Sequence, residues 1–148
     1  MKIQPIRNGT VIDHIMPGQA VRVLRILGIP KASSDSIVSV AMNVSSRMKK
    51  KDVVKVENRE LDPKEVDKIA LIAPKATINI IRNYEVVEKH KVKLPREVVG
   101  IIRCSNPTCV SNSDEPIESR FLVINNDPPR IKCYYCEREP EDIAARII

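Results

Sequence analysis

Aromatic residues are scarce in this chain, which has no Trp, one Phe and three Tyr among its 148 residues. A core without large rings must be built from Val, Ile, Leu and Ala, a composition that suits a mixture of strands and helices. The chain also offers no aromatic platform on which nucleobases could stack. Its apolar fraction of 43% is nevertheless enough for one ordinary globular domain or two small ones.

Catalytic motifs are absent as well. Four glycines in total leave little material for a phosphate-binding loop, and the sequence has no P-loop, G-x-G-x-x-G, nucleophile elbow or H-E-x-x-H motif. His90 stands in a charged segment and is expected to be an exposed strand residue, whereas His14 follows Asp13 at the end of an apolar segment. In a regular strand these two neighbours point to opposite faces of the sheet. Neither histidine has the sequence neighbours of a hydrolytic triad.

Long hydrophobic runs are also lacking. The apolar segments "IALIAP" and "VRVLRILGI" are too short, or too interrupted by Arg, to span a bilayer. The N-terminal "MKIQPIRNG" does not contain the apolar core of a secretory signal. We therefore expect a cytoplasmic protein without a membrane partner, in a compartment where clustered cysteines are more typical of a metal site than of disulfides.

The cysteines are confined to the last third of the chain, with the spacing C-x4-C, then 23 residues, then C-x2-C. Two such pairs from two loops can place four thiolates around one tetrahedral Zn²⁺, and the predicted ligands are Cys104, Cys109, Cys133 and Cys136. Because the segment from residue 96 onward has few apolar residues, one structural zinc ion would stabilise a small zinc-ribbon or rubredoxin-like β domain. Redox chemistry at "CYYC" is the alternative.

Strand-like and helix-like patterns alternate in the first 95 residues. The second helix has the clearest start and stop signals. Asp62 can cap its N-terminus, Pro63 occupies the first helical position and Glu65 completes a capping box. Pro74 ends the helix. We expect strands at residues 8–15, 36–44, 52–58, 76–83 and 84–94, and helices at residues 18–28 and 61–74. This order, βαββαβ plus one strand, predicts an α+β ferredoxin-like domain with an antiparallel sheet covered on one face by two helices.

Two connecting segments complete the prediction. The basic segment 45–51 is expected to be a loop between two strands, with "RMKKKD" as a solvated hairpin tip and phosphate or nucleic-acid contact as the alternative. Residues 94–100, "LPREVVG", are expected to be the linker into the cysteine-containing segment.

Charge is distributed unevenly between the two parts. Residues 1–95 carry 18 Lys and Arg against 10 Asp and Glu, whereas residues 96–148 carry 7 against 9. The first part therefore suits an anionic ligand better than the second. The sequence pI of about 9.3 makes a nucleic-acid-binding zinc protein the alternative function. The acidic zinc segment argues against it, because phosphate neutralisation needs cations on the binding module.

Four features together resemble a known family. The segments "NGTVIDHI", "KKDVVKVEN" and "ATINIIRNYEVVEK", with the cysteine spacing that ends in "CYYCE", are similar to the regulatory chain of aspartate carbamoyltransferase, the enzyme that commits aspartate to pyrimidine synthesis. The resemblance implies a non-catalytic subunit in which residues 1–95 bind the nucleotide effectors CTP and ATP. It also implies that residues 96–148 bind zinc and dock on the catalytic chain, and that regulatory chains form a dimer.

The resemblance further implies an effector site. In it, Asp13 and Lys55 would approach the ribose and base, while His14 and Lys89 would meet the phosphates. Pro5 departs from the family pattern, because it removes a backbone N–H that lies near the effector in other members. The implied effector contacts are Ile6, Val11, Asp13, His14, Lys55, Asn79, Ile81, Tyr84, Val86 and Lys89.

Overall fold

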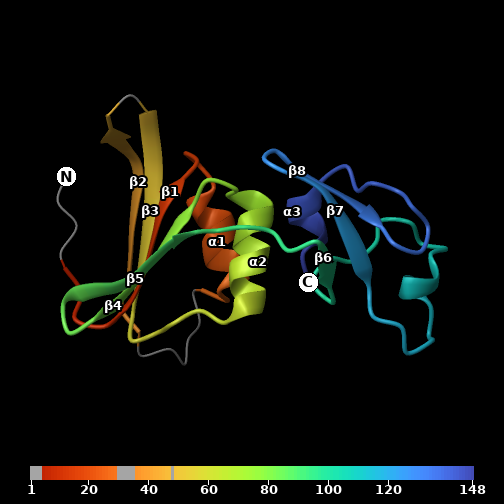
Figure 1. Cartoon of the computed structure of the whole chain (residues 1–148), viewed down its shortest axis with the longest axis horizontal. Helices are drawn as coiled ribbons and strands as arrows, with labels where there is room; N and C mark the ends of the chain where they lie inside the picture. The colour runs from red at the N-terminus through yellow and green to blue at the C-terminus, as the bar shows by residue number, and fades with distance from the viewer. Residues whose placement is uncertain (1–4, 30–35, 48) are drawn as a thin grey trace.

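The computed structural model describes residues 5–29, 36–47 and 49–148, which form two antiparallel sheets with helices between them (Figure 1). The first sheet has the strand order β2-β3-β1-β4-β5, and the second has the order β6-β7-β8. None of the helices in the described ranges has the length and apolar character that a bilayer crossing requires. The elements are β1 (Gly9–Ile15), α1 (Ala20–Ile26), β2 (Val38–Ser46), β3 (Lys49–Glu57), α2 (Pro63–Ile72), β4 (Thr77–Arg82), β5 (Glu85–Lys91), β6 (Glu97–Val99), the 3-10 helix η1 (Val110–Asn112), β7 (Arg120–Asn126), β8 (Pro129–Cys133) and α3 (Ile143–Arg146).

This architecture confirms the predicted α+β class. The first sheet is five-stranded and antiparallel with two main helices, and a small β unit that holds all four cysteines follows it. The four strands of the βαββαβ unit lie in the order β2-β3-β1-β4, and the extra strand β5 adds to the edge beside β4. Residues 30–35 and Met48, which fall within or beside the expected connections, lie outside the described residues.

The two faces of the first sheet differ in character. Ile12, Val54 and Ile78 pair across the three central strands and belong to the core that α1 and α2 cover. Residues at alternate positions point to the other face. No helix of the described chain covers that second face in Figure 1, and we call it the open face.

Helix α2 lies between the two sheets (Figure 1). Its capping box is present as predicted, since Glu65 N–H donates to Asp62 Oδ1 at 3.0 Å and Asp62 N–H donates to Glu65 Oε1 at 3.2 Å. Four consecutive residues, 69–72, are buried near its C-terminal end. Consecutive helical residues cannot share one face, so this burial reflects contact with α1 on one side and with α3 and β8 on the other.

The predicted hairpin is present, but its loop is shorter than expected, and part of the expected linker is a strand. Residues 45–46 belong to β2 and residues 49–51 to β3, and Ser46 pairs with Lys49. The basic segment is therefore mostly a paired hairpin, because the two strands extend almost to the turn. In the expected linker, residues 97–99 form β6 and pair with β7. Val98 is 2% exposed and joins the core, so this segment contributes to the second sheet.

A buried carboxylate connects three elements of the first part. Asp52, in β3, has no exposed surface. Its Oδ2 accepts N–H donors from Gly18 at 2.8 Å and Ala20 at 3.2 Å, at the start of α1, and its Oδ1 accepts the Asn43 N–H at 2.8 Å. Asn43 lies where the register of β2 shifts and has a φ of 62°. One side chain thus satisfies three backbone donors that the sheet ladder does not.

Substitution Asp52→Asn should lower the free energy of unfolding by about 2–3 kcal/mol, because the carboxamide NH₂ would face backbone N–H donors that lose their acceptor. Urea unfolding of the full chain measures this change. The control is Glu85→Gln, an exposed side chain on β5, for which a change within about 0.5 kcal/mol is expected. Equal stability of the Asp52 variant and the unmodified chain would show that these hydrogen bonds are not stabilising.

Candidate functional site

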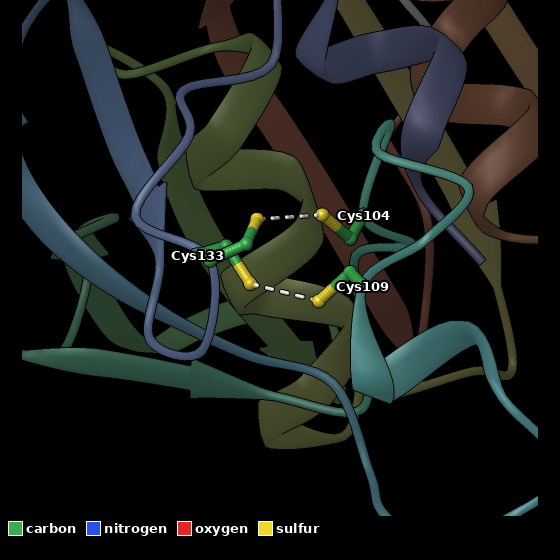
Figure 2. A group of neighbouring side chains, drawn as sticks. Cys104, Cys109 and Cys133 are labelled. Atoms are coloured by element: carbon green, nitrogen blue, oxygen red, sulfur yellow. Dashed lines mark hydrogen bonds between the residues drawn. The ribbon is translucent and has the colours of Figure 1, made fainter.

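The four cysteines converge from two segments of the second part. Cys104 and Cys109 lie in the connection between β6 and η1, Cys133 ends β8, and Cys136 lies in the turn that follows. Figure 2 shows the side chains of Cys104 and Cys109 facing that of Cys133. The structure therefore brings together all four residues that the sequence indicated as metal ligands.

The spacing of the sulfur atoms fits one tetrahedral ion. All four Sγ atoms lie within 4.8 Å of one another. The Sγ atoms of Cys104 and Cys136 are 3.6 Å apart, and those of Cys109 and Cys133 are 3.7 Å apart. Metal–sulfur bonds of about 2.3 Å in a tetrahedron would separate the sulfurs by about 3.8 Å, whereas a disulfide needs about 2.05 Å. The cluster is thus placed to bind a metal, and all four cysteines are free thiols.

Burial of the thiols makes metal ligation depend on pH. Burial raises the pKa of Cys104 to about 12 and also raises the pKa of Cys133. Burial acts in the same direction on Cys136, but hydrogen bonds from the Arg138 backbone and from neighbouring side chains outweigh it and lower the pKa of Cys136 to about 7. Without a cation, Cys104 and Cys133 would carry protons at neutral pH. Binding of a divalent metal must therefore displace protons.

Polar side chains hold the cysteine loop in shape. Asn112 Nδ2 donates to the carbonyls of Cys104, at 2.9 Å, and Asn106, at 2.7 Å. Asn106 Oδ1 in turn accepts the N–H and the hydroxyl of Thr108, at 3.1 and 2.9 Å. Arg146 Nη2, in α3, donates to the Cys104 carbonyl at 2.8 Å. Sequence reasoning missed Asn112 and Arg146, because only the folded loop shows which carbonyls need donors.

The predicted effector residues form rows across the open face of the first sheet. Lys55 in β3 pairs with Val11 in β1, which pairs with Asn79 in β4, which pairs with Lys89 in β5. Directly paired residues point to the same face, so one row presents a lysine on either side of Val11 and Asn79. The Asn79 Nδ2 donates to the Val11 carbonyl at 3.3 Å, which fixes the amide in this row.

Two further rows flank the first one. Toward the start of β1, Gly9 pairs with Ile81, which pairs with Val86. In the other direction, Asp13 pairs with Thr77, and Thr77 pairs with Lys91. Apart from Glu57, which pairs with Gly9, the open face is thus apolar at one end, and it is polar at the other.

A β-bulge alters the expected geometry at His14. The register of β1 shifts between Ile12 and Ile15, and His14 has a φ of 57°. As a result, the His14 Nδ1 lies 3.1 Å from the Thr77 hydroxyl and 3.9 Å from the Asp13 carboxylate. The prediction that Asp13 and His14 point to opposite faces was therefore wrong, because the extra residue of a bulge interrupts strand alternation.

Tyr84 and Ile6 lie near the apolar end of the open face. The Tyr84 N–H donates to the Arg7 carbonyl at 2.8 Å, so the turn between β4 and β5 lies beside the segment that precedes β1. Tyr84 has a φ of 66° and its side chain is exposed, whereas Ile6 is buried. The structure thus places these two predicted residues at one edge of the rows.

A cleft with basic walls opens at the polar end. It has a volume of about 780 Å³, and we call it the basic cleft. Sequence reasoning missed Lys51, Thr77 and Lys91 as candidate site residues, because cross-strand register decides which neighbours they have. The residues that line the cleft are His14, Ile15, Met16, Pro17, Ser46, Arg47, Lys49, Lys50, Lys51, Pro74, Lys75, Thr77, Lys91 and Asp127.

Two charged groups on the open face have shifted pKa values. Burial raises the pKa of Asp13, but hydrogen bonds from Lys51 and from the His14 backbone outweigh it, and the net shift is downward. The Lys51 Nζ lies 2.8 Å from Asp13 Oδ1. Burial lowers the pKa of Lys55. Asp13 therefore remains an ionised hydrogen-bond acceptor within a basic surface.

The affinity of the cysteine cluster for Zn²⁺ or Co²⁺ should rise between about pH 6 and about pH 8. Because the buried thiols Cys104 and Cys133 bind the metal only after losing their protons, we expect at least about a tenfold gain per pH unit. Competition with a chromophoric chelator of known proton affinity measures it. An affinity that does not change with pH would contradict thiolate ligation.

The chain matches two family models, one in each part. The model described as aspartate carbamoyltransferase regulatory chain, allosteric domain, matches residues 1–93. The model described as aspartate carbamoyltransferase regulatory chain, metal binding domain, matches residues 96–144.

Several curated relatives carry the name aspartate carbamoyltransferase regulatory chain. The protein from Methanocella arvoryzae is 63% identical over 139 residues, which cover 93% of this chain and 88% of the relative. The protein from Methanothermobacter thermautotrophicus is 58% identical over the same shares of the two chains. The protein from Pyrococcus horikoshii is 49% identical over 150 residues, which cover 99% of this chain and 98% of the relative. The chain therefore belongs to the family of aspartate carbamoyltransferase regulatory chains.

Proposed function

We propose that this chain is the cytoplasmic, non-catalytic regulatory subunit of an aspartate carbamoyltransferase. Residues 1–95 bind CTP or ATP on the open face, and residues 96–148 hold zinc and dock on the catalytic chain. The observation that carries the proposal is the alignment of the predicted effector residues in rows that lead into the basic cleft.

In this proposal, a nucleoside triphosphate lies along the rows of the open face. The apolar end, with Ile81, Val86 and Tyr84, receives the base. In the central row, Lys55 approaches the ribose and base and Lys89 meets the first phosphates, and Asp13 in the neighbouring polar row approaches the ribose. From Gly9 to Asp13 the strand rises by about 13 Å, which takes the phosphate chain past His14 and into the basic cleft. Several lysines there can donate charge-assisted hydrogen bonds to phosphate oxygens.

Zinc is the metal that the cysteine cluster suits best. Four thiolates form a closed tetrahedral shell, which is typical of structural zinc and leaves no position for a catalytic water. When bound, the ion supplies crosslinks between the cysteine loop and the end of β8. Asn112 and Arg146 orient the loop carbonyls, so this part of the chain presents a rigid surface to a catalytic chain.

Helix α2 provides a physical route between the two sites. On one side it contributes to the core beneath the open face, and on the other it contacts α3 and β8. Lys68 Nζ in α2 also donates to the Ile148 carbonyl at 2.7 Å. An effector that shifts this helix would alter the docked surface, with a coupling free energy of about 1–3 kcal/mol. Ligands of the catalytic chain must then change nucleotide affinity by the same factor.

A dimer of regulatory chains would use the edge of the first sheet. Strand β2 is an edge strand, and Val40 and Met42 on it are exposed. An edge strand offers unpaired backbone groups to a second strand. The same edge of another copy of this chain is the proposed partner.

Titration of the purified chain with CTP, ATP and a short DNA duplex, at two salt concentrations, tests the proposal. The nucleotides should bind at both concentrations, whereas non-specific duplex binding should weaken steeply with salt. Salt-resistant binding of the duplex, without binding of either nucleotide, would favour the nucleic-acid function and overturn the proposal. Co-purification with a carbamoyl-transferring catalytic chain tests the docking function.

Substitution Lys89→Ala should weaken CTP and ATP binding by about tenfold or more while leaving nucleoside binding nearly unchanged, because the lost ammonium group contacts phosphate. Isothermal titration calorimetry measures both ligands. Lys93→Ala is the matched control, since Lys93 is also exposed but lies outside the rows. Equal losses for nucleoside and triphosphate would remove Lys89 from the phosphate site.

Substitution Cys109→Ala should abolish metal retention and assembly with the catalytic chain, because the second part depends on the ion for stability. Nucleotide binding should be retained, since the open face and its two helices belong to the first part. Metal analysis, size-exclusion chromatography with the catalytic chain, and calorimetry provide the three measurements. The exposed neighbour Val110 supplies the control Val110→Ala, and loss of nucleotide binding together with the metal would contradict the division into two domains.

A further inference from the structure

The basic cleft contains a carboxylate from the metal-binding part. Among the described residues that line it, Arg47, Lys49, Lys50, Lys51, Lys75 and Lys91 are cationic, and Asp127 is the single acidic residue. Asp127 lies in the turn between β7 and β8, whereas the cations belong to the first part. Figure 1 shows the tip of this hairpin directed toward the first part.

The β7–β8 turn is held in this position by contacts on both sides. The Asp127 carboxylate lies 4.0 Å from Lys75 Nζ, in the connection between α2 and β4. The preceding residue, Asn126, accepts the Leu94 N–H at 3.2 Å, close to the end of β5. Within the turn, Asn125 Nδ2 donates to the Pro128 carbonyl at 2.9 Å. The ion pair is thus presented by an anchored turn, at the wall of the cleft.

We propose that Asp127 is a specificity-determining residue of the effector site, and that a bound phosphate chain displaces it from Lys75. This inference rests on the proposed function and extends it, because it makes the metal-binding part a sensor of the number of phosphates. A nucleoside monophosphate occupies the rows without reaching the cleft. A triphosphate reaches the cleft and exchanges partners with Asp127.

Electrostatics gives the direction of the effect. An exposed ion pair contributes little to stability, so Lys75 changes partner at low cost. A polyphosphate carries several charges and binds lysine more strongly than one carboxylate does. The remaining Asp127 carboxylate then lies among anions, within the screening distance of about 8–10 Å. Repulsion favours movement of the β7–β8 turn away from the cleft, and the turn carries this change into the second sheet.

The decisive experiment measures dissociation constants of CTP, CDP, CMP and inorganic tripolyphosphate by calorimetry with the full chain. Substitution Asp127→Asn should tighten CTP and tripolyphosphate by about three- to tenfold, CDP less, and CMP by less than about twofold. Asp114→Asn is the matched control, because it removes the same charge from an exposed position of the second part outside the cleft. Equal tightening in both variants would reduce the effect to net charge and overturn the proposal.

Exchange at Lys75 has its own readout. In Lys75→Gln, the gain caused by Asp127→Asn should fall to about twofold or less, since one partner of the exchange is missing. If the effects of the two substitutions on the CTP dissociation constant simply add, the proposed exchange of partners at Lys75 is overturned.

Amide hydrogen exchange of the unmodified chain tests directly whether the β7–β8 turn moves when a nucleotide binds. The amides of residues 125–127 should exchange faster when CTP is bound, but not when CMP is bound. Unchanged exchange with CTP would overturn the sensor role.

Tripolyphosphate separates this inference from the proposed function. If the chain binds tripolyphosphate with the expected Asp127 effect but binds no nucleotide, the inference stands and the nucleotide function fails. If nucleotides bind and Asp127→Asn changes none of the dissociation constants, the function stands and the inference fails. Absence of binding by every polyphosphate overturns both.

Discussion

The backbone register of the first sheet is the constraint on which the candidate effector site depends. Lys55, Val11, Asn79 and Lys89 come from four strands and become one row only because each antiparallel pair is in its observed register. A slip of one residue in a strand would send its side chains to the helix-covered face. The buried core therefore enforces the site, since the same register places Ile12, Val54 and Ile78 beneath the helices.

The two parts of the chain reach stability by different means. The first has a continuous aliphatic core between a sheet and two helices. The second has a three-stranded sheet and a cluster of thiols, two of which have raised pKa values in the absence of a cation. A bound metal would take the place of the protons on these thiols and crosslink the segments that carry them. Cysteine appears only in the second part, which contributes fewer buried aliphatic side chains to the core.

Local signals in the sequence predicted much of the fold and part of the site. The capping box of Asp62 and Glu65 and the metal cluster are encoded by short spacings, and both are present. Features that depend on tertiary contacts were not predictable. Three such features depend on backbone groups of segments that are distant in the sequence. They are the bulge at His14, the buried acceptor Asp52 and the pairing of residues 97–99. The basic cleft combines both sheets, so no single segment carries its signature.

Burial of α2 on two sides places a constraint on how this family can diversify. Side chains at residues 69–72 are shared between two hydrophobic interfaces, and a change that improves the fit to one neighbour alters the fit to the other. Divergence of the helix therefore requires compensating substitutions in both parts of the molecule. Residues of the open face are not shared between two such interfaces in the described chain, so substitutions there need no compensation in the helix.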